Sequence, residues 1–427
     1  MSDKLKNVLE TYKFYRDLRD YVHRLINHNK SKKYNRRVES ILNNIKSKET
    51  INIVFFIHSL SYWKYDGLVK LLKDNPRFKF VLVPFINPSQ DKTLSLNFIE
   101  QIQKYCIKND LPIYNSYNFE TGQYDDLSFL SPDVVIYTHP YNVGYKKLLI
   151  DEFKDKCVFF YTPYGVSLTK GSYFYDTYLT NVAYRIFVGS ELEKIEFKKY
   201  FKSSNDKYVT TGFTIFDDIE NAKESNVIWP DDNKKRIIWA PHHSIDARLS
   251  FASSNFERLC DDMLSIAKKY SDNINISLKP HPLLMTRLYQ KWGKDRTTQY
   301  FDEWNKLDNT FICNGNYSEL FAQSDALIHD CASFACEYLL TEKPAFYICK
   351  GDKPNAGIDN DFGLRCFEQH YHGYSVDDIE AFIENIIKGT DSLRDARIEF
   401  VRKYLLPPDG KSVAENMMFN LLDIFKK

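Results

Sequence analysis

Short apolar runs alternate with longer segments of helical spacing from residue 51 onward. In the first half the predicted strands are Ile51–Ile57, Phe80–Phe85, Val134–Tyr137, Val158–Tyr161, Ile186–Val188 and Tyr208–Thr211. In the second half they are Ile237–Ala240, Ile274–Leu278, Phe311–Cys313, Ala326–Ile328 and Ala345–Ile348. Runs that are almost entirely apolar indicate strands buried on both faces, as in parallel sheets covered by helices. The sequence therefore predicts an α/β fold with two Rossmann-like halves.

The chain divides into three predicted regions: an arm over residues 1–48, a first domain over 49–215 and a second over 216–427. Its 427 residues exceed the length at which a single core usually stops growing. The polar, turn-rich stretch 217–235 is interpreted as the connection between the domains. Helical spacing over 376–387 and 414–425 predicts helices that pack back across the cleft between the domains.

The arm combines basic charge with an apolar stripe. Its 48 residues contain thirteen Lys and Arg against five Asp and Glu, a net charge of +8. The apolar positions near helical spacing are Val8, Tyr12, Tyr15, Leu18, Val22, Leu25 and Ile26. This pattern predicts an amphipathic basic helix. Two interpretations stay open: attachment to an anionic inner membrane surface or a partner there, and a solvated helix packed on the protein body.

Bulk composition is that of an ordinary globular protein, with 43% hydrophobic and 27% charged residues. A net charge of +1 gives no support to nucleic acid as a partner. The eight cysteines are scattered without CxxC spacing, which is typical of reduced buried thiols. We see no signal peptide and no apolar run of the ~20 residues that a spanning helix requires. We therefore expect a cytoplasmic protein, peripheral at the inner face of the membrane if the arm binds there.

Two common nucleotide motifs are missing, because neither half contains GxGxxG or GxxxxGK[ST]. Dehydrogenase and P-loop functions therefore lose their main support. The pair Asp359 and Asp361 lies in a polar loop well beyond the nearest predicted strand, so no metal requirement is indicated.

Polar side chains follow three predicted strands of the second half. They are His242 and His243 after the first, Lys279 and His281 after the second, and Asp330, Ala332 and Ser333 after the fourth. Because the carboxyl ends of parallel strands meet at one edge of a sheet, we expect these groups to line one crevice. Lys279 and His281 would cost desolvation energy if buried without an anion. The pattern therefore favours a diphosphate ligand.

Ser333 and Glu337 each allow two interpretations. The Ser333 hydroxyl either joins the free N–H groups of the following helix around a phosphate or acts as a plain N-cap. Glu337, about two helical turns beyond Asp330, either accepts hydrogen bonds from a ribose or base or is a carboxylate at the edge of the core.

In the first half, His58 and His139 each follow a predicted strand, and Tyr161–Gly165 follows a third. A histidine with a pKa near neutrality beside a cleft suits a general base for a hydroxyl. A satisfied structural histidine is the alternative at both positions.

The ordered motifs of the second half resemble those of a known family. They are Trp239-Ala240-Pro241-His242-His243, Leu278-Lys279-Pro280-His281-Pro282, Ser324-Asp325, His329-Asp330-Cys331-Ala332-Ser333-Phe334 with Glu337, and Lys343-Pro344. Over residues 236–350 this order is similar to the C-terminal half of the CDP-glycerol glycerophosphotransferases. That family comprises teichoic acid and capsule polymerases with a GT-B fold, in which two Rossmann-like domains face each other across a cleft.

By this resemblance, His281 and Ser333 contact the donor diphosphate. The chain departs from the family pattern in two places. Ala332 stands where the family usually has a second hydroxyl residue. The family's His-Gly-Thr-Pro segment, with its presumed base, corresponds to 161–165, where no histidine occurs. His139, in preference to His58, is expected to replace that base.

The resemblance implies a transferase that moves a polyol phosphate, such as glycerol phosphate, from a CDP-activated donor to a cell-surface glycan of the capsule, teichoic acid or lipopolysaccharide type. The acceptor, free or lipid-linked, would bind residues 49–215 and the nucleotide donor residues 216–427. No cofactor is expected beside this activated substrate. Lys279, His281, Ser333 and helix N–H groups would stabilise charge on the leaving phosphate.

Three other functions stay open at this point. A GT-B glycosyltransferase would use a nucleotide sugar on the same fold for surface polysaccharide synthesis. An enzyme like UDP-N-acetylglucosamine 2-epimerase also has two Rossmann-like halves but needs no polymer acceptor. An inactive scaffold of a capsule-assembly complex would explain the missing first-domain histidine.

Overall fold

The computed structural model describes residues 18, 21–22, 24–86, 92–118, 120–125, 127–141, 148–200, 205–245, 254–315, 317–351 and 357–426. These residues form two compact units. Unit 1 contains the described residues up to Gly165, then Gly171–Thr214, and those from Pro407 onward. Unit 2 contains Val166–Lys170 and Ile215–Leu406. The sequence had placed the segment from residue 407 in the second domain, whereas the structure gives it to unit 1.

The core of unit 1 is a parallel sheet of six strands in the order β2-β1-β3-β4-β5-β6. The strands are β1 (Ile51–Ile57), β2 (Phe78–Pro84), β3 (Val134–Tyr137), β4 (Val158–Tyr161), β5 (Arg185–Val188) and β6 (Tyr208–Thr210). All six were predicted, with ends shifted by at most two residues. Nearly every residue of β1, β3 and β4 is buried, as the continuous apolar runs require.

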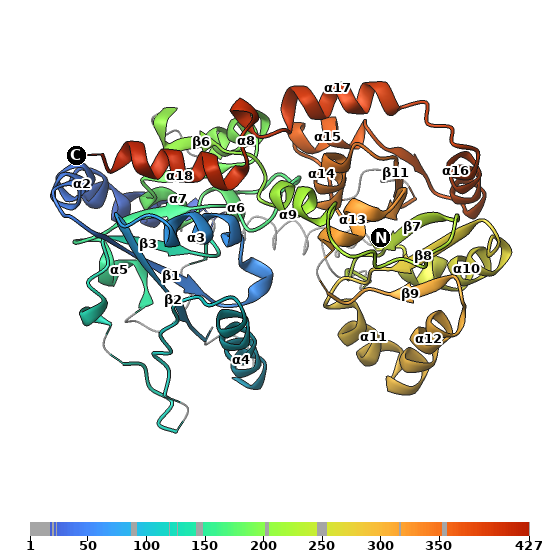
Figure 1. Ribbon diagram of the computed structural model, residues 1–427, viewed down its shortest axis with the longest axis horizontal. Helices are drawn as coiled ribbons and strands as arrows, with labels where there is room; N and C mark the ends of the chain where they lie inside the picture. The colour runs from blue at the N-terminus through green and yellow to red at the C-terminus, as the bar shows by residue number, and fades with distance from the viewer. Residues whose placement is uncertain are drawn as a thin grey trace. The chain divides into compact units, whose positions relative to one another are not determined.

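The sheet of unit 1 is flanked by helices of mixed length. The α-helices are α2 (Val38–Lys46), α3 (Asp66–Lys73), α4 (Lys92–Lys108), α5 (Ile150–Phe153), α6 (Ser172–Tyr175), α7 (Tyr178–Val182), α8 (Glu191–Tyr200) and α18 (Val413–Ile424). Helix α18 begins at a capping box formed by Ser412 and Glu415 and lies beside α3 (Figure 1). Gly212, just after β6, lets the first residue of α18 pack close to it, because a Cβ at its position would lie 2.8 Å from the Val413 side chain.

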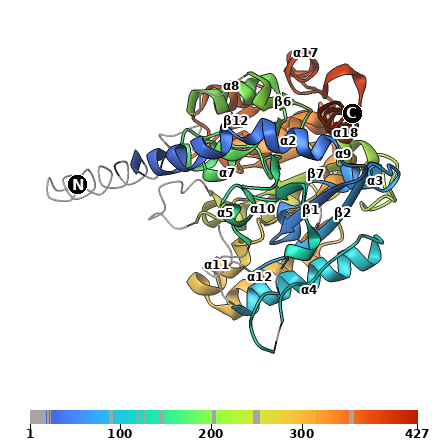
Figure 2. The ribbon, with the colours of Figure 1, turned by 90° about the vertical axis from the view of Figure 1, so that its left-hand side faces the viewer.

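The later part of the arm packs on unit 1. Residues 24–35 and α2 are helical (Figure 2). Ile41, Leu42 and Ile45 of α2 are buried. The Tyr34 hydroxyl donates to the carbonyl of Cys157, and Arg24 pairs with Asp176. Leu18, Val22, Leu25 and Ile26, in contrast, are 44–46% exposed, and Val8, Tyr12 and Tyr15 lie outside the described residues. The interpretation of the arm as a helix packed on the protein body therefore holds for 24–46. The apolar side chains of Leu18, Val22, Leu25 and Ile26 nevertheless stay on the surface.

Unit 2 contains a second parallel sheet of six strands in the order β12-β11-β10-β7-β8-β9. The strands are β7 (Lys235–Ala240), β8 (Ile274–Leu278), β9 (Thr310–Ile312), β10 (Ala326–His329), β11 (Ala345–Ile348) and β12 (Tyr371–Gly373). Strand β12 was not predicted, because its three residues carry no apolar run. Two parallel sheets covered by helices confirm the predicted α/β class.

The helices of unit 2 include one in the predicted connection. They are α9 (Ile215–Ala222), α10 (Phe256–Lys269), α11 (Leu284–Trp292), α12 (Lys294–Lys306), α13 (Ser318–Gln323), α14 (Phe334–Glu337), α15 (Asp361–Phe367), α16 (Val376–Lys388) and α17 (Arg394–Tyr404). The interpretation of 217–235 as an irregular linker was wrong for its start. Ile215, Ile219 and Ala222 form a buried helical stripe on α9, which packs against α13.

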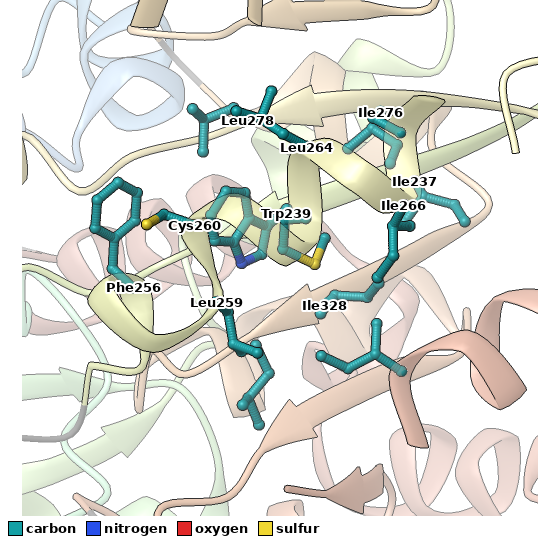
Figure 3. Close-up of a cluster of buried hydrophobic side chains, with 14 of the residues drawn as sticks. Ile237, Trp239, Phe256, Leu259, Cys260, Leu264, Ile266, Ile276, Leu278 and Ile328 are labelled. Atoms are coloured by element: carbon teal, nitrogen blue, oxygen red, sulfur yellow. The ribbon is translucent and has the colours of Figure 1, made fainter. Parts of the chain in front are cut away.

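The core of unit 2 lies beneath the strands that end in the predicted site. Trp239 of β7, 1% exposed, stacks on Phe256 of α10 at a ring-centroid distance of 5.6 Å (Figure 3). Leu278 of β8 and Ile328 of β10 belong to the same cluster. A buried aromatic residue of this kind typically contributes about 3–5 kcal/mol. The carboxyl ends of the three strands therefore emerge from a rigid base.

The eight cysteines all lie in the described residues and form no disulfide, and only Cys313 is not fully buried. Within the described residues, no helix combines the length and the apolar character needed to cross a membrane.

Candidate functional site

Strands β10, β7 and β8 are neighbours in the sheet of unit 2, so the polar groups after them meet at one edge. Ala240 pairs with His329, and Trp239 pairs with Leu278. The loops are joined beyond the strands as well, because the His281 N–H donates to the Pro241 carbonyl. The order of strands along the chain does not reveal this adjacency, but the topology of parallel sheets predicts a shared edge.

His242, His243 and His281 form a compact cluster at this edge. The ring centroids of His243 and His281 are 4.1 Å apart, and those of His242 and His243 are 4.2 Å apart. His242 and His281 lie 5.1 Å apart. Three imidazoles at such distances cannot all be protonated without strong mutual repulsion.

Hydrogen bonds to the backbone fix the tautomers of two of these rings. The Nδ1 atom of His281 accepts the N–H of Leu283 at 3.1 Å. The Nδ1 atom of His242 accepts the N–H of Ser244 at 3.3 Å and lies 2.8 Å from the Ser244 hydroxyl, which can also donate to it. A neutral imidazole whose Nδ1 accepts carries its proton on Nε2. Both rings therefore present an Nε2–H donor.

Burial keeps the cluster neutral at physiological pH. It is the largest cause of the lowered pKa values, which are about 3 for His242, about 4 for His243 and about 2 for His281. Neighbouring charge adds to this effect, mainly from Arg287 at His243 and from the other two histidines at His281. An arriving anion would raise these pKa values, so the cluster can gain charge when a ligand binds.

The same three histidines have the spacing of a metal site, since one nitrogen of each lies within 4.8 Å of the others. A metal ion needs an unprotonated nitrogen from every ligand. In His242 and His281 the unprotonated nitrogen is already occupied by a backbone N–H. The observed arrangement therefore presents donors and suits an anion better than a cation.

Lys279, the first residue after β8, is a buried cation at this edge. It is only 6% exposed, and among the residues that the structure describes none accepts a hydrogen bond from its Nζ. Its ammonium lies 6.0 Å from the ring centroid of Tyr317, and burial lowers its pKa. Removing an ammonium from water without an acceptor is costly. Lys279 therefore points to an anionic ligand.

Tyr317 and Glu337 extend the site on the side of α14. The Tyr317 hydroxyl donates to Glu337 Oε2 at 2.7 Å, and Glu337 is 5% exposed. Sequence reasoning missed Tyr317, which lies in the loop before α13. Glu337 is thus a buried carboxylate beside the candidate anion site, and its hydrogen bond with Tyr317 links the two side chains.

Asp330 has a positioning role in the structure. Its carboxylate accepts the backbone N–H of His242 at 2.6 Å and that of Asn255 at 2.5 Å. Asp330 is 1% exposed, and burial raises its pKa to about 6. Its oxygens hold the loops around the cluster.

Ala332 and Ser333 lie at the same edge and are part-exposed. The Ser333 side chain makes no cap hydrogen bond, and α14 has only four residues before the chain continues as a 3-10 helix over Tyr338–Thr341. The helix that follows Ser333 is therefore much shorter than the sequence pattern indicates. Its dipole adds little to the binding of a phosphate here.

Arg287 is the cation that sequence reasoning missed. It lies on α11, and its positive charge helps to lower the pKa values of His242, His243 and His281. The available signal was its position in the first turn of the helix that follows His281.

Unit 1 contains a buried pair of histidines at the ends of two neighbouring strands. His58 and His139 follow β1 and β3, which are neighbouring strands, and both are 2% exposed. Their ring centroids are 6.0 Å apart. Burial lowers the pKa of His139 to about 4, and His58 adds to that shift. The structure thus brings the two histidines together at neighbouring strand ends, and their catalytic role stays a prediction.

Aromatic rings and hydroxyl groups surround this pair. The rings of Tyr62 and Tyr164 are 4.7 Å apart, and Tyr62 is 5.6 Å from His139. Thr138 and Thr162 follow β3 and β4, and their hydroxyl oxygens are buried without partners among the described residues. Buried polar atoms without partners are rare and need an explanation, such as a bound water or ligand.

Solved structures with the same architecture include two enzyme classes. A UDP-GlcNAc 2-epimerase from Neisseria meningitidis bound to UDP-GlcNAc matches with a TM-score of 0.59 and 13% identity, covering 88% of this chain and 100% of that one. The wall teichoic acid polymerase TagF, solved as a variant, matches with a TM-score of 0.57 and 15% identity, covering 97% and 98%. At these identities the similarity shows the fold alone, which is the GT-B type.

No curated protein matches the chain. The family model described as CDP-Glycerol:Poly(glycerophosphate) glycerophosphotransferase matches residues 165–420, more than half of the sequence. The match contains the histidine cluster, Lys279 and every residue expected to bind the donor. The chain therefore belongs to the CDP-glycerol:poly(glycerophosphate) glycerophosphotransferase family and is a transferase.

Proposed function

We propose that this protein transfers a polyol phosphate, such as glycerol phosphate, from a CDP-activated donor to a cell-surface glycan. The observation that carries the proposal is Lys279, a buried cation without an acceptor, beside two imidazole Nε2–H donors in the segment that matches the family. A diphosphate supplies the missing negative charge and the acceptor oxygens.

In this reaction an acceptor hydroxyl oxygen attacks the polyol phosphate, and the bond between that phosphorus and the oxygen of CMP breaks. CMP leaves with the negative charge. Lys279, the His242 and His281 N–H groups and the charge of Arg287 stabilise that charge because they are already oriented in a water-poor site. The acceptor proton passes to a base. We assign that base to the histidine pair of unit 1, since no histidine stands in 161–165.

Tyr317 and Glu337 suit the nucleoside part of the donor. Glu337 accepts a hydrogen bond from the Tyr317 hydroxyl at 2.7 Å, which holds its carboxylate at the edge of the site. A carboxylate of this kind accepts hydrogen bonds from vicinal hydroxyls, which a ribose provides.

A glycosyltransferase that uses a nucleotide sugar is the second candidate. The fold and the anion site suit both, and the family match favours phosphate transfer. The epimerase-like function has the support of the fold alone. In an inactive scaffold no bound anion would offset the free-energy cost of burying Lys279, which disfavours the scaffold function.

The test is a screen of the purified full chain against CDP-glycerol, CDP-ribitol, UDP-sugars and CMP-sugars with glycan acceptors. We expect release of CMP from a CDP-polyol and transfer of radiolabelled polyol phosphate to the acceptor. Release of UDP without CMP would replace the proposal with the glycosyltransferase. Conversion of UDP-GlcNAc without an acceptor would replace it with the epimerase.

The capsule, teichoic acid or lipopolysaccharide acceptor lies at the cell envelope, so we also propose that the arm attaches the enzyme to the inner membrane surface. The exposed stripe of Leu18, Val22, Leu25 and Ile26 repeats at helical spacing. Lys32, Lys33 and Arg36 on the following turns are exposed. An apolar stripe with basic neighbours is typical of helices that lie in an anionic interface.

A further inference from the structure

The chain crosses from unit 1 to unit 2 and back within a few residues after β4. Unit 1 is interrupted between Gly165 and Gly171, and the residues between them, Val166–Lys170, belong to unit 2. We call Val166–Lys170 the crossing segment. It follows directly on residues 161–165, which correspond to the base-carrying segment of the family and contain no histidine in this chain. Contacts that hold the crossing segment therefore also limit where 161–165 can lie.

A turn of unit 2 binds the backbone of the crossing segment. The N–H groups of Asp359 and Asn360 both donate to the carbonyl of Leu168, at 2.9 and 3.2 Å. The Asn360 side-chain N–H donates to the carbonyl of Ser167 at 3.0 Å. The Asp359 carboxylate accepts the N–H of Lys170. These bonds use backbone groups of the crossing segment, so they fix the path of the chain there.

The same contact is closely packed. Leu168 is 1% exposed and Asn360 is 0% exposed. A Cβ added at Gly363, in the first turn of α15, would lie 2.8 Å from the Leu168 carbonyl oxygen, so glycine is needed for this approach. Segments with buried side chains and bonded backbone groups open least often in the native state. The turn and the crossing segment therefore form one firmly held piece of unit 2.

The acidic pair of the polar loop, Asp359 and Asp361, flanks Asn360 in this turn. Asp361 begins α15, and Asn360 is the N-cap of that helix. The side-chain oxygen of Asn360 accepts the N–H of Gly363 at 2.6 Å. One side chain thus caps a helix with its oxygen and binds the crossing segment with its nitrogen.

Tyr164, two residues before the crossing segment, belongs to the ring cluster around the histidine pair of unit 1. Its ring centroid lies 4.7 Å from that of Tyr62, which in turn lies 5.6 Å from His139. The hydroxyl oxygens of Tyr164 and Tyr141 are 3.3 Å apart. A displaced Tyr164 would therefore alter the surroundings of the histidines to which the base is assigned.

We propose that Asn360 is a positioning residue for the transfer reaction: its side-chain nitrogen fixes the crossing segment, and the crossing segment holds Tyr164 beside the histidine pair. The inference rests on the proposed transferase function and refines it, because it gives a part in the reaction to a loop that the donor site does not use. Asn360 acts through the backbone of residues 164–168. Misplacement of reacting groups by about 1 Å can lower a rate about 100-fold.

Asn360→Asp is the selective test. Aspartate is as good an N-cap as asparagine, but it presents an oxygen instead of an N–H to the Ser167 carbonyl. We expect kcat for transfer of polyol phosphate to fall about 10-fold or more, while the affinity for CDP, measured by calorimetry, stays within about 3-fold. Gly363→Ala should give the same split between kcat and affinity, because its methyl group displaces Leu168 and leaves every hydrogen-bonding group in place.

Asn309→Asp is the matched control. Asn309 is another buried amide of unit 2, and it donates to the carbonyls of Ala267 and Ile274, which lie outside the crossing segment. Its aspartate variant should lose stability in denaturant titration and keep its kcat. An equal loss of kcat in Asn309→Asp and Asn360→Asp would show that the effect is a general loss of stability, and would overturn the proposal.

Hydrogen exchange of the full chain tests the positioning without any substrate. Deuterium uptake by peptides that contain 166–170 should rise in Asn360→Asp and stay at the wild-type level in Asn309→Asp. Equal uptake in the wild type and Asn360→Asp would show that Asn360 does not hold the crossing segment, and the proposal would fail.

The failure of this inference can be separated from that of the proposed function. If the wild-type chain releases no CMP from any CDP-polyol, the function fails, and hydrogen exchange still decides whether Asn360 holds the crossing segment. If the wild type is active and Asn360→Asp keeps full kcat, the function stands and the positioning role is wrong.

Discussion

The carboxylate of Asp330 accepts the backbone N–H of His242 at 2.6 Å. This bond joins the end of β10 to the loop after β7 and determines where the His242 ring lies. The second oxygen accepts the N–H of Asn255 at 2.5 Å, so one buried side chain fixes two loops. The loop that carries His242 in the candidate site is thus held in place by the carboxylate of Asp330.

Asp330→Asn should therefore weaken both the fold and the site. An amide has one acceptor oxygen, so one of the two backbone N–H groups would face an NH₂ group. We expect a loss of about 1–3 kcal/mol in the free energy of unfolding. Denaturant titration measures this loss, and isothermal calorimetry with CDP measures the parallel loss of affinity. Unchanged CDP affinity would show that His242 is held by other contacts.

Lys279→Met should separate stability from binding. The unliganded protein should become more stable by about 1 kcal/mol, because a buried cation without an acceptor is removed. The affinity for CDP should fall about 10- to 100-fold. Lys343→Met is the matched control, since Lys343 donates to the carbonyls of Phe321 and Ala322. The control should lose stability and keep its CDP affinity. A Lys279→Met variant that binds CDP like the wild type would contradict the anion site.

Substitutions at His281 should distinguish an anion site from a metal site. Glutamine retains an N–H donor near Nε2, whereas asparagine retains only an acceptor near Nδ1. CDP affinity should therefore stay within about 3-fold in His281→Gln and fall about 10-fold in His281→Asn. Chelator treatment of the wild type should leave this affinity unchanged. Stoichiometric zinc in the purified protein, with loss of CDP binding after chelation, would favour the metal.

A buried histidine pair in unit 2 should make the protein sensitive to acid. His329 and His370 have ring centroids 5.3 Å apart, and their Nδ1 atoms donate to the carbonyls of Cys331 and Cys366. Burial lowers both pKa values, to about 4 for His370. The unfolded chain, with a histidine pKa near 6.5, then binds more protons than the folded chain below pH 6.5.

Stability should accordingly fall as the pH drops from about 6.5 towards 4. His370 alone contributes about 2 kcal/mol of that loss by pH 5. His370→Asn keeps a donor for the Cys366 carbonyl and removes the titrating group. Its free energy of unfolding should change less between pH 7 and pH 5 than that of the wild type, as measured by denaturant titration. Equal changes in the two proteins would show that His370 is not the sensitive group.

The arm stripe should bind anionic vesicles. Replacing Leu25 and Ile26 together with serine should reduce co-sedimentation with vesicles of anionic lipid about 10-fold or more, because each buried apolar side chain contributes about 1.5–3 kcal/mol. Ile195→Ser, which changes an exposed apolar residue of α8, is the matched control. Binding that is identical in both variants would argue against membrane attachment by this stripe. Deletion of all of 1–48 is not a suitable test, because it also removes the buried side chains of α2.

Sequence patterns predicted the two sheets because their strands are buried on both faces and read as apolar runs. They missed β12, whose sequence Tyr371–Gly373 has no such run, and α9, whose buried stripe is interrupted by Asp217, Asp218 and Glu220. They brought His242, Lys279 and His281 to one edge from topology alone. Sequence patterns did not identify Arg287 and Tyr317 as site residues, because tertiary packing rather than a motif places them near this edge of the sheet.

Helix α18 packs against α3 in unit 1, although it follows all of unit 2 in the sequence. On the ribosome, the strands from β1 to β6 emerge long before the segment that covers them, while unit 2 is almost continuous over 215–406. All residues of unit 2 are therefore synthesised before the last segment of unit 1. We expect nascent chains released before residue 407 to contain a protease-resistant second unit and a protease-sensitive first one.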